Sequence, residues 1–578
     1  MMGCCLRLLS FFLLCAVAFF STVNAFSLDR EAFSISKYDL QVRIDPAQQR
    51  LGVRGTVTVR NDSATPQKTA VLQISSSLSW LSIRERGKLL QFVSQPYNSD
   101  IDHTGALSEA IVTLPNAVAS KSAMELDIAY EGIVPLDATR LTRIETPTDA
   151  ARATDWDQIS SQFTAVRGAG YVTWYPIETD AASLLQGMDL FAVLRRWKAR
   201  ERASSMRLRF EVSIGDEADK PELLVNASSC QSAHEQGSEF LADCTSGSLA
   251  SMVPTFVIAN YEVVERPDIA VHFLRGHDES AANYADAAER VVPLIKDWFG
   301  APRAKAETAD LPTPDAAPFE SGSLFLTPLA SLDSKLGGLV AAHQLTHAAM
   351  SSPRPWINEG LAHFAQALYL QQQKGREAAL EYIRTHGFSS AAGEQSSTPK
   401  GEDEVSRSLI NTADEQLYRS KAMCVWWMLR DLIGDQALKK AIASYRPEQD
   451  KEPSYMQRLI QAQTQRDVEW FFDDWVYRDR GLPDFKVESA FTRKLLPEGY
   501  MVTITVMNLG AAGAEVPVTV KSAGGDVTKR LVVRGNSNAV VRVETVSAPE
   551  EIVVNDGSVP ESDTANNTFK IDGSEIAK

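Results

Sequence analysis

Two histidines and one carboxylate stand at a spacing that suits a metal ion. His343 and His347 are four residues apart within 338–350, a stretch whose apolar pattern predicts a helix. Side chains at i and i+4 share one helix face, so the two imidazoles lie one turn apart. Glu359 falls in the first turn of the next predicted helix and supplies a third ligand. With a water, these groups form the tetrahedral set of a zinc site. We therefore expect one Zn²⁺ per chain at His343, His347 and Glu359.

A histidine pair alone is weak evidence, since packed histidines also fall at this spacing by chance. The sequence WINEG at 356–360 strengthens the metal interpretation, because it places a carboxylate at the start of the following helix. The alternative, in which both histidines pack in the core of a structural protein, stays open. His363 lies four residues after Glu359 on the same helix face, and is either a partner of the ligand set or a packed histidine.

Hydropathy patterns indicate the elements that must position these residues. Helical periodicity covers about 280–300, 337–350, 358–386, 413–446 and 454–478, and a Ser-, Gly- and Glu-rich stretch at 389–407 is expected to be an exposed loop. Residues 481–484, with a glycine and a proline, end the helical part.

Strand-like alternation flanks the helical part on both sides. It begins at 38–44 and 53–59 and continues to about Val264, where 252–264 is interpreted as one closing strand. Alternation returns from Tyr500 in short stretches separated by turns, a pattern typical of a small antiparallel sandwich. The order is therefore a β-rich domain, a helix-rich domain and a second β-rich domain.

The composition is that of an ordinary globular protein with an acidic surface. The chain has 578 residues, of which 44% are hydrophobic and 23% charged, and its net charge is −16. Such a surface repels phosphate backbones and carries no basic stripe, so we expect no nucleic acid partner.

The first 25 residues have the layout of a secretory signal peptide. A weakly positive start is followed by an apolar run at 8–20 and by small residues that predict cleavage after Ala25. The run is shorter than the roughly 20 residues needed to span a bilayer, although a membrane anchor stays open as the alternative. No later run is long enough, so we expect no membrane span after signal removal and an exported, periplasmic or secreted protein.

Three cysteines remain after the signal. Cys230 and Cys244 bracket a polar stretch between strand-like segments, and an oxidising compartment favours a disulfide between them. Cys424 lies in an apolar helical pattern and is interpreted as a small buried hydrophobic residue.

These motifs resemble the gluzincin zinc metallopeptidases of the alanyl aminopeptidase (membrane alanine aminopeptidase) family and its shorter bacterial peptidase-MA-like relatives. The family carries HExxH followed by WxxEG, and this chain has HQLTH at 343–347 and WINEG at 356–360. The stretches 254–260 and 470–478 also resemble the family, and the likeness extends over most of 30–485.

The resemblance implies a multidomain α+β fold. An aminopeptidase-like β saddle or sandwich is expected over 26–265, a thermolysin-like α-rich gluzincin domain over 266–486, and a small C-terminal β-sandwich over 487–578. It also implies that Glu320 takes the place of the glutamate that holds the free α-amine of a substrate, so that ligands are peptides with a free N-terminus.

The catalytic glutamate of the family is replaced here by Gln344. That carboxylate normally takes a proton from metal-bound water and passes it to the leaving amine, whereas an amide cannot accept a proton. Losing a general base typically costs about 10² to 10⁴ in rate. The interval of eleven residues between His347 and Glu359 is shorter than in the longer aminopeptidases and suits the peptidase-MA-like relatives.

The tyrosine that steadies the oxyanion in the family is also displaced. Aligning Lys421 with the family puts Arg419 at that position and Tyr418 one residue early. A cation there stabilises an oxyanion. The alternative is that Tyr418 packs on its helix and Arg419 points to solvent.

Two hypotheses of function follow, and the sequence leaves open which holds. One is an exported zinc metallopeptidase homologue, aminopeptidase-like, whose hydrolysis is weakened by Gln344. The other is a non-catalytic pseudopeptidase that binds peptides or acts as a scaffold for a protein partner.

Overall fold

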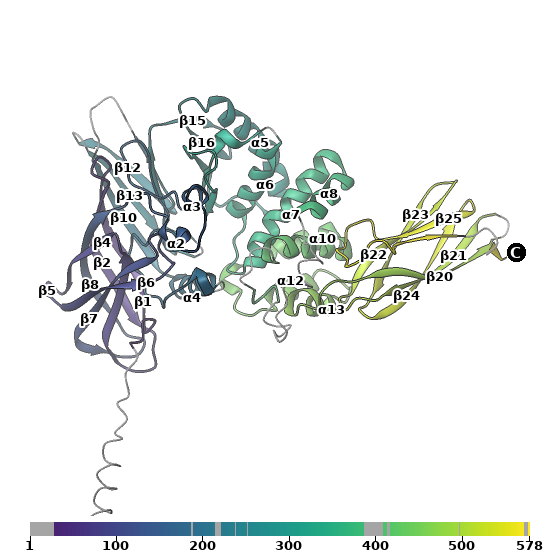
Figure 1. Cartoon of the computed structure of the whole chain (residues 1–578), viewed down its shortest axis with the longest axis horizontal. Helices are drawn as coiled ribbons and strands as arrows, with labels where there is room; N and C mark the ends of the chain where they lie inside the picture. Colours follow the sequence, from purple (N-terminus) through teal and green to yellow (C-terminus); the bar gives the residue numbers. More distant parts are fainter. Residues whose placement is uncertain are drawn as a thin grey trace, which may run out of the picture.

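The computed structural model describes residues 28–578 apart from short gaps. The gaps are 187–188, 214–220, 237–238, 251, 334, 387–407, 413–416, 496–497, 572–575 and 578. The predicted signal peptide at 1–25 and the predicted loop at 389–407 lie outside the described residues. Figure 1 shows a multidomain arrangement in which a β-rich region, a helical region and a second β-rich region follow one another.

The N-terminal region is built on a large sheet with alternating burial. In its central strand Tyr38, Leu40 and Val42 are fully buried while the residues between them are partly exposed. This alternation matches the period of two of a strand with one face in the core. The eight-stranded sheet has the order β12 (Ser229–Gln236), β13 (Glu239–Ser246), β10 (Ser205–Ser213), β1 (Phe33–Asp45), β2 (Arg50–Asn61), β8 (Ala123–Ile133), β4 (Leu78–Glu85), β5 (Lys88–Leu89), and a three-stranded sheet has the order β3 (Gln67–Ser75), β7 (Ala106–Val118), β6 (Gln91–Asn98).

Cys230 and Cys244 lie directly opposite each other on β12 and β13 and form a disulfide. Cys424 is buried in the helical region.

The prediction of strand-like structure up to about Val264 misses three helices. These are α2 (Thr139–Thr142), α3 (Thr148–Thr154) and α4 (Asp189–Glu201). The first two are too short to show a helical period. In α4 the apolar face is formed by Leu190, Val193 and Trp197, and an arginine-rich remainder conceals that periodicity in the sequence.

The prediction of one closing strand at 252–264 is also wrong. Strand β14 (Phe256–Ala259) pairs with β11 (Glu222–Val225) and β9 (Thr164–Val166), whereas β15 (Tyr261–Glu265) pairs with β16 (Ile269–Leu274) in another sheet. The chain changes sheets at Asn260. The sequence does not reveal this change, because apolar alternation indicates a strand but not its pairing partner.

The helical region contains a five-stranded sheet as well as its helices. The sheet has the order β15, β16, β17 (Ala306–Asp310), β19 (Leu324–Thr327), β18 (Phe319–Ser321). The helices are α5 (Asp278–Phe299), α6 (Leu336–Ala349), α7 (Pro355–Lys374), α8 (Arg376–His386), α10 (Ala422–Ile433), α11 (Asp435–Ser444), α12 (Tyr455–Gln461) and α13 (Glu469–Phe472), with π-helical turns η3 (Leu417–Lys421) and η5 (Asp473–Tyr477). Helix α5 packs on β16, α6 on α5, and α7 on α6. The predicted helix 358–386 is two helices, because Gly375 ends α7 with a φ of 87°.

The C-terminal region consists of two four-stranded sheets that share a core with the helices. Their orders are β24 (Ser537–Thr545), β21 (Tyr500–Asn508), β20 (Phe485–Lys494), β27 (Ile576–Ala577), and β23 (Val527–Val533), β22 (Ala514–Ser522), β25 (Pro549–Val554), β26 (Thr568–Lys570). One hydrophobic cluster runs from the helices into these sheets. Within the described part of the chain, none of the helices combines the length and apolarity needed to cross a membrane.

Candidate metal centre

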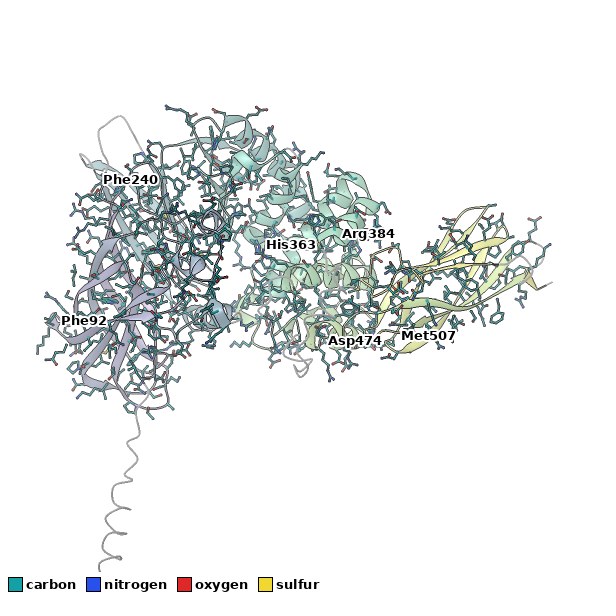
Figure 2. All side chains as sticks on the ribbon, in the orientation of Figure 1. Phe92, Phe240, His363, Arg384, Asp474 and Met507 are labelled. Carbon is teal, nitrogen blue, oxygen red and sulfur yellow. A yellow bond between two sulfur atoms is a disulfide. The ribbon has the colours of Figure 1, made fainter. Side chains whose placement is uncertain are left out.

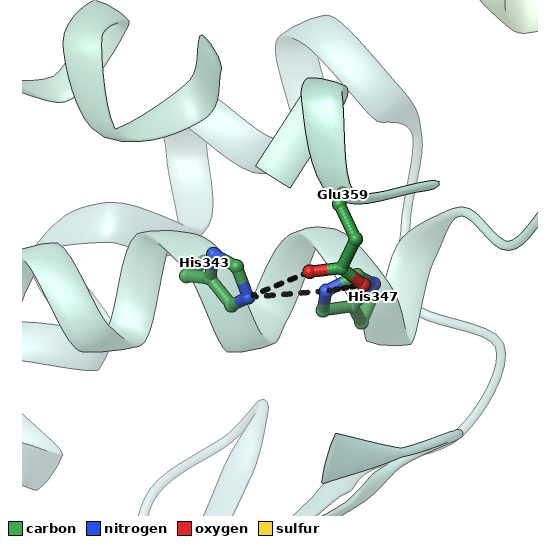
Figure 3. Close-up of side chains that lie close together, drawn as sticks. All are labelled: His343, His347 and Glu359. Carbon is green, nitrogen blue, oxygen red and sulfur yellow. Dashed lines mark hydrogen bonds and ion pairs between the residues drawn. The ribbon is translucent and has the colours of Figure 1, made fainter. Parts of the chain in front are cut away.

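Helices α6 and α7 bring His343, His347 and Glu359 to one point (Figure 3). The two Nε2 atoms of the histidines are 3.2 Å apart. The carboxylate oxygens of Glu359 lie 3.8 Å from His343 Nε2 and 3.5 Å from His347 Nε2. One ligand atom from each residue falls within 4.8 Å of the others. Two imidazole nitrogens and one carboxylate oxygen so close together are a donor set that fits zinc.

The core beneath the centre fixes the start of α7. Pro355 opens the helix, and the next residue, Trp356, is fully buried and stacks on Trp426 of α10 at 5.0 Å between ring centroids. Gly360 lets α10 approach, because a Cβ there would lie 2.7 Å from the Cβ of Ala422. This packing sets the turn on which Glu359 faces α6.

Asn358 connects the ligands to the loop before α7. Its side-chain nitrogen lies 3.2 Å from His347 Nδ1 and 3.1 Å from a carboxylate oxygen of Glu359, and its oxygen accepts from the backbone N–H of Ser352. Such contacts orient metal ligands in proteins.

Burial and neighbouring charges set the protonation of the centre. Burial, with His347 and His363 nearby, lowers the pKa of His343 well below its usual range. Burial also lowers the pKa of His363 to about 4. Burial alone would raise the pKa of Glu359, but the charges of His347 and Arg419 outweigh it and lower that pKa. His343 is therefore neutral and Glu359 ionised at neutral pH, the states in which they bind a metal.

Gln344 is fully buried, and its amide is engaged on both sides. Its oxygen accepts a hydrogen bond from the hydroxyl of Tyr284 on α5. Its nitrogen donates to Thr327 Oγ1 at 2.9 Å and to Glu320 Oε1 at 3.3 Å. Burial raises the pKa of Glu320. Gln344 is thus a hydrogen-bonding link between α6 and strands β18 and β19 of the neighbouring sheet.

The turn η3 places Tyr418 and Arg419 differently. Tyr418 is buried in the core of the helical region. The guanidinium of Arg419 turns toward the centre, with Nε 3.5 Å from Glu359 Oε2.

His363 lies against the metal cluster rather than in it. Its ring centroid is 4.8 Å from that of His343, and its Nδ1 contacts Gln366 Oε1 at 2.9 Å. Its Nε2 is buried and has no hydrogen-bond partner among the residues that the structure describes. Figure 2 shows it among the helices.

Several residues of the site left no signal in the sequence. Tyr284 and Thr327 reach Gln344 from distant parts of the chain, so no local spacing announces them. Asn358 directly precedes Glu359 within WINEG, and this position next to a predicted metal ligand is the one clue to its role in the sequence.

The sequence matches no family model and no curated protein. Among solved structures, Legionella pneumophila aminopeptidase A in complex with aspartic acid is similar with a TM-score of 0.60 at 12% identity, over 92% of this chain and 59% of that one. An M1 zinc metallopeptidase from Deinococcus radiodurans matches at 16% identity and a TM-score of 0.49, over 78% of this chain and 95% of that one. The chain thus has a fold like that of a solved aminopeptidase, of which it spans 59% of the length.

Proposed function

We propose that this protein is an exported zinc metallopeptidase homologue of the gluzincin type, which binds peptides through their free N-terminus and hydrolyses them weakly. The observation that carries the proposal is the cluster of His343, His347 and Glu359. Gln344 follows His343 directly in the sequence, and both the oxygen and the nitrogen of its amide form hydrogen bonds. In this view the helical region is a thermolysin-like domain, preceded by an aminopeptidase-like β saddle and followed by a β-sandwich.

Each residue of the centre has a separate task in this function. A zinc ion held by the two histidines and Glu359 would polarise a peptide carbonyl. The carboxylate of Glu320 pairs with the ammonium group of the ligand. The side-chain nitrogen of Gln344 donates a hydrogen bond to one oxygen of the Glu320 carboxylate. Arg419 supplies a positive charge for an oxyanion. Gln344 accepts no proton, and this is why hydrolysis is slow.

The alternative is a pseudopeptidase that binds peptides without cleaving them. The specific observation in its favour is that the Gln344 amide already has partners for both its oxygen and its nitrogen. Export is part of the proposal, and the disulfide between Cys230 and Cys244 supports it because such bonds persist in oxidising compartments.

The test is a zinc determination combined with a peptide-binding measurement on the purified full chain. We expect about one zinc per chain, from the three-residue ligand set, and loss of most of it in His347→Ala. A peptide with a free N-terminus should bind more tightly than its acetylated form. Aminoacyl-arylamide hydrolysis should rise about 10² to 10⁴-fold in Gln344→Glu.

The outcomes separate the hypotheses. Zinc with no hydrolysis in either chain favours the pseudopeptidase. Absence of zinc from the native chain contradicts the metal centre, and equal binding of free and acetylated peptides contradicts the role of Glu320.

A further inference from the structure

Glu320 lies on an edge strand of the five-stranded sheet. Strand β18 pairs with β19, and its other edge has no strand beside it among the described residues. Phe319 and Ser321 are buried, and Glu320 between them is half-buried. Successive side chains of a strand point to opposite faces. Glu320 faces α6, where it accepts a hydrogen bond from Gln344 at 3.3 Å, so its two neighbours face the other way.

The N-terminal region contacts the buried face of β18. The hydroxyl oxygen of Ser321 accepts a hydrogen bond from Asn226 Nδ2 at 2.7 Å and another from the backbone N–H of Val253 at 2.8 Å. The ring of Phe319 packs edge-on against the ring of Tyr171, with 5.3 Å between the centroids. Both neighbours of the glutamate are thus held by residues of the N-terminal region.

A further attachment fixes the chain just before β18. Trp156 Nε1 donates to the backbone oxygen of Ala317 at 2.9 Å, and the N–H of Ala317 donates to the backbone oxygen of Ala153 on α3 at 2.7 Å. Figure 1 shows α3 where the β-rich region meets the helical region. The contacts at 317, 319 and 321 resist a rotation of β18 about its own axis, and such a rotation would move the Glu320 carboxylate.

Asn226 is itself rigidly held. It is buried, and its backbone N–H donates to the backbone oxygen of Thr255 at 2.9 Å. Its Nδ2 also donates to the backbone oxygen of Val253 at 3.1 Å, which fixes the orientation of the amide because a carbonyl oxygen only accepts. The turn after β18 fits closely around the same side chain, since Gly322 has a φ of 64° and a Cβ there would lie 3.3 Å from Asn226 Oδ1.

Among the described residues, Asn226 is the one side chain of the N-terminal region that hydrogen-bonds to a side chain of β18. We propose that Asn226 is a positioning residue, which aims the Glu320 carboxylate at the ammonium group of the ligand by holding Ser321. The inference rests on the proposed function and extends it, because it gives the N-terminal region a part in recognising the free N-terminus of a peptide.

The test is calorimetric binding of a tripeptide and of its acetylated form to the zinc-loaded full chain. The native chain should prefer the free amine. Asn226→Ala should weaken binding of the free peptide about tenfold, which corresponds to about 1.4 kcal/mol. The affinity for the acetylated peptide should not change, because that peptide has no ammonium group for Glu320. The zinc content should also stay the same, because the ligand cluster lies on α6 and α7.

Asn61→Ala is the matched control. Asn61 is a buried asparagine of the same region, and its Nδ2 donates to the backbone oxygens of Thr65 and Val118, each at 2.8 Å. The control therefore loses two comparable hydrogen bonds away from β18. It should lower the resistance of the chain to urea and keep the full preference for the free amine.

Ser321→Ala tests the other end of the contact with a smaller change in volume, and it decides the question if Asn226→Ala does not fold. It should show the same loss of preference. The variant that carries both changes should show no further loss, because the two residues act through one hydrogen bond.

Two results overturn the inference and leave the proposed function standing. One is an unchanged preference in Asn226→Ala, or in Ser321→Ala where the first variant does not fold. The other is an equal loss of preference in Asn61→Ala, which would show that the preference follows general stability. A native chain that binds the free and acetylated peptides equally overturns the proposed role of Glu320, and the inference with it.

Discussion

The Gln344 amide is matched on both sides by the groups that contact it. A hydrogen-bond donor at this position meets the carboxylate of Glu320 at 3.3 Å, and an acceptor meets the hydroxyl of Tyr284. A glutamate would place two carboxylates against each other in a buried setting, where like charges are costly. The amide therefore suits its neighbours, even though it cannot serve as a base.

This fit predicts the cost of replacing the amide with a carboxylate. Gln344→Glu should lower the free energy of unfolding by about 1–3 kcal/mol, because a buried acceptor loses its donor. Glu320→Gln places an amide donor opposite the carboxylate introduced by Gln344→Glu. The variant that carries both changes should therefore be more stable than the sum of the two single effects predicts. Urea unfolding of the four chains measures this coupling. Additive effects on the free energy of unfolding would show that the contact between residues 344 and 320 does not stabilise the fold.

At the scale of elements, the approach of α7 and α10 decides where Glu359 stands. Gly360 lies at the closest point, with Ala422 and Trp426 across from it. In the sequence Gly360 is only one letter of WINEG. The packing of α7 against α10 explains why a residue without a side chain is needed there.

We predict that Gly360→Ala destabilises the protein although alanine is the better helix former. The new Cβ would lie 2.7 Å from Ala422 Cβ and 2.9 Å from Trp426 Nε1, so α10 must shift. The expected loss of unfolding free energy is about 1–3 kcal/mol, together with lower zinc content. Gly337→Ala on α6 is the control, because its nearest foreign atom is 3.7 Å away. Equal stability of the two variants would contradict the prediction.

A second contact between elements joins the N-terminal region to the sheet beside α5 and α6. His272 of β16 has Nδ1 2.8 Å from Glu222 on β11 and Nε2 2.5 Å from Glu307 on β17. Burial lowers its pKa, but the two carboxylates outweigh burial and raise the pKa from 6.5 to about 9.

This contact predicts a loss of stability in alkaline solution. Because the folded pKa is raised, the contribution of His272 is fully present below about pH 6.5 and is lost as the pH rises through about 9. Both carboxylates are partly exposed, so salt reduces the effect. Urea unfolding between pH 6 and 10 should show a steeper decline in the native chain than in His272→Gln. Parallel declines in the two chains would refute this.

At the scale of the whole molecule, the C-terminal sheets are continuous with the helical core. Trp475 is fully buried and donates to the backbone oxygen of Gly513 at 2.7 Å, while Asp474 accepts from the N–H of Gly513 at 2.9 Å. Figure 2 shows Asp474 where the helices meet the C-terminal strands. The N-terminal region, by contrast, has a core cluster of its own.

We therefore expect the helices and the C-terminal sheets to unfold together. Trp475→Phe removes the hydrogen bond to Gly513 and should cost about 1–3 kcal/mol in the common transition. Trp80→Phe is the control, since its indole donates to the backbone oxygen of Ser108 within the N-terminal region. Hydrogen exchange measured by mass spectrometry reports on each segment of the chain, and opening of the C-terminal strands at a lower urea concentration than the helices would contradict the shared core.

Features with local evidence could be predicted from the sequence. Spacings of a few residues indicate the i, i+4 histidines, the glutamate at the start of the next helix and the alternation of β1. The structure has α6, α7 and β1 at those places. Helix and strand periods are set by the backbone, so a short window of sequence suffices to recognise them.

Contacts between distant residues could not be predicted from the sequence and are seen in the folded chain. Tyr284 lies 60 residues from Gln344, and Glu222 contacts His272 from a strand of another sheet. The change of sheet at Asn260 is of the same kind, since β14 and β15 are equally strand-like in the sequence. These pairings depend on how whole elements pack, and packing depends on shape and burial across the fold rather than on any periodicity along the chain.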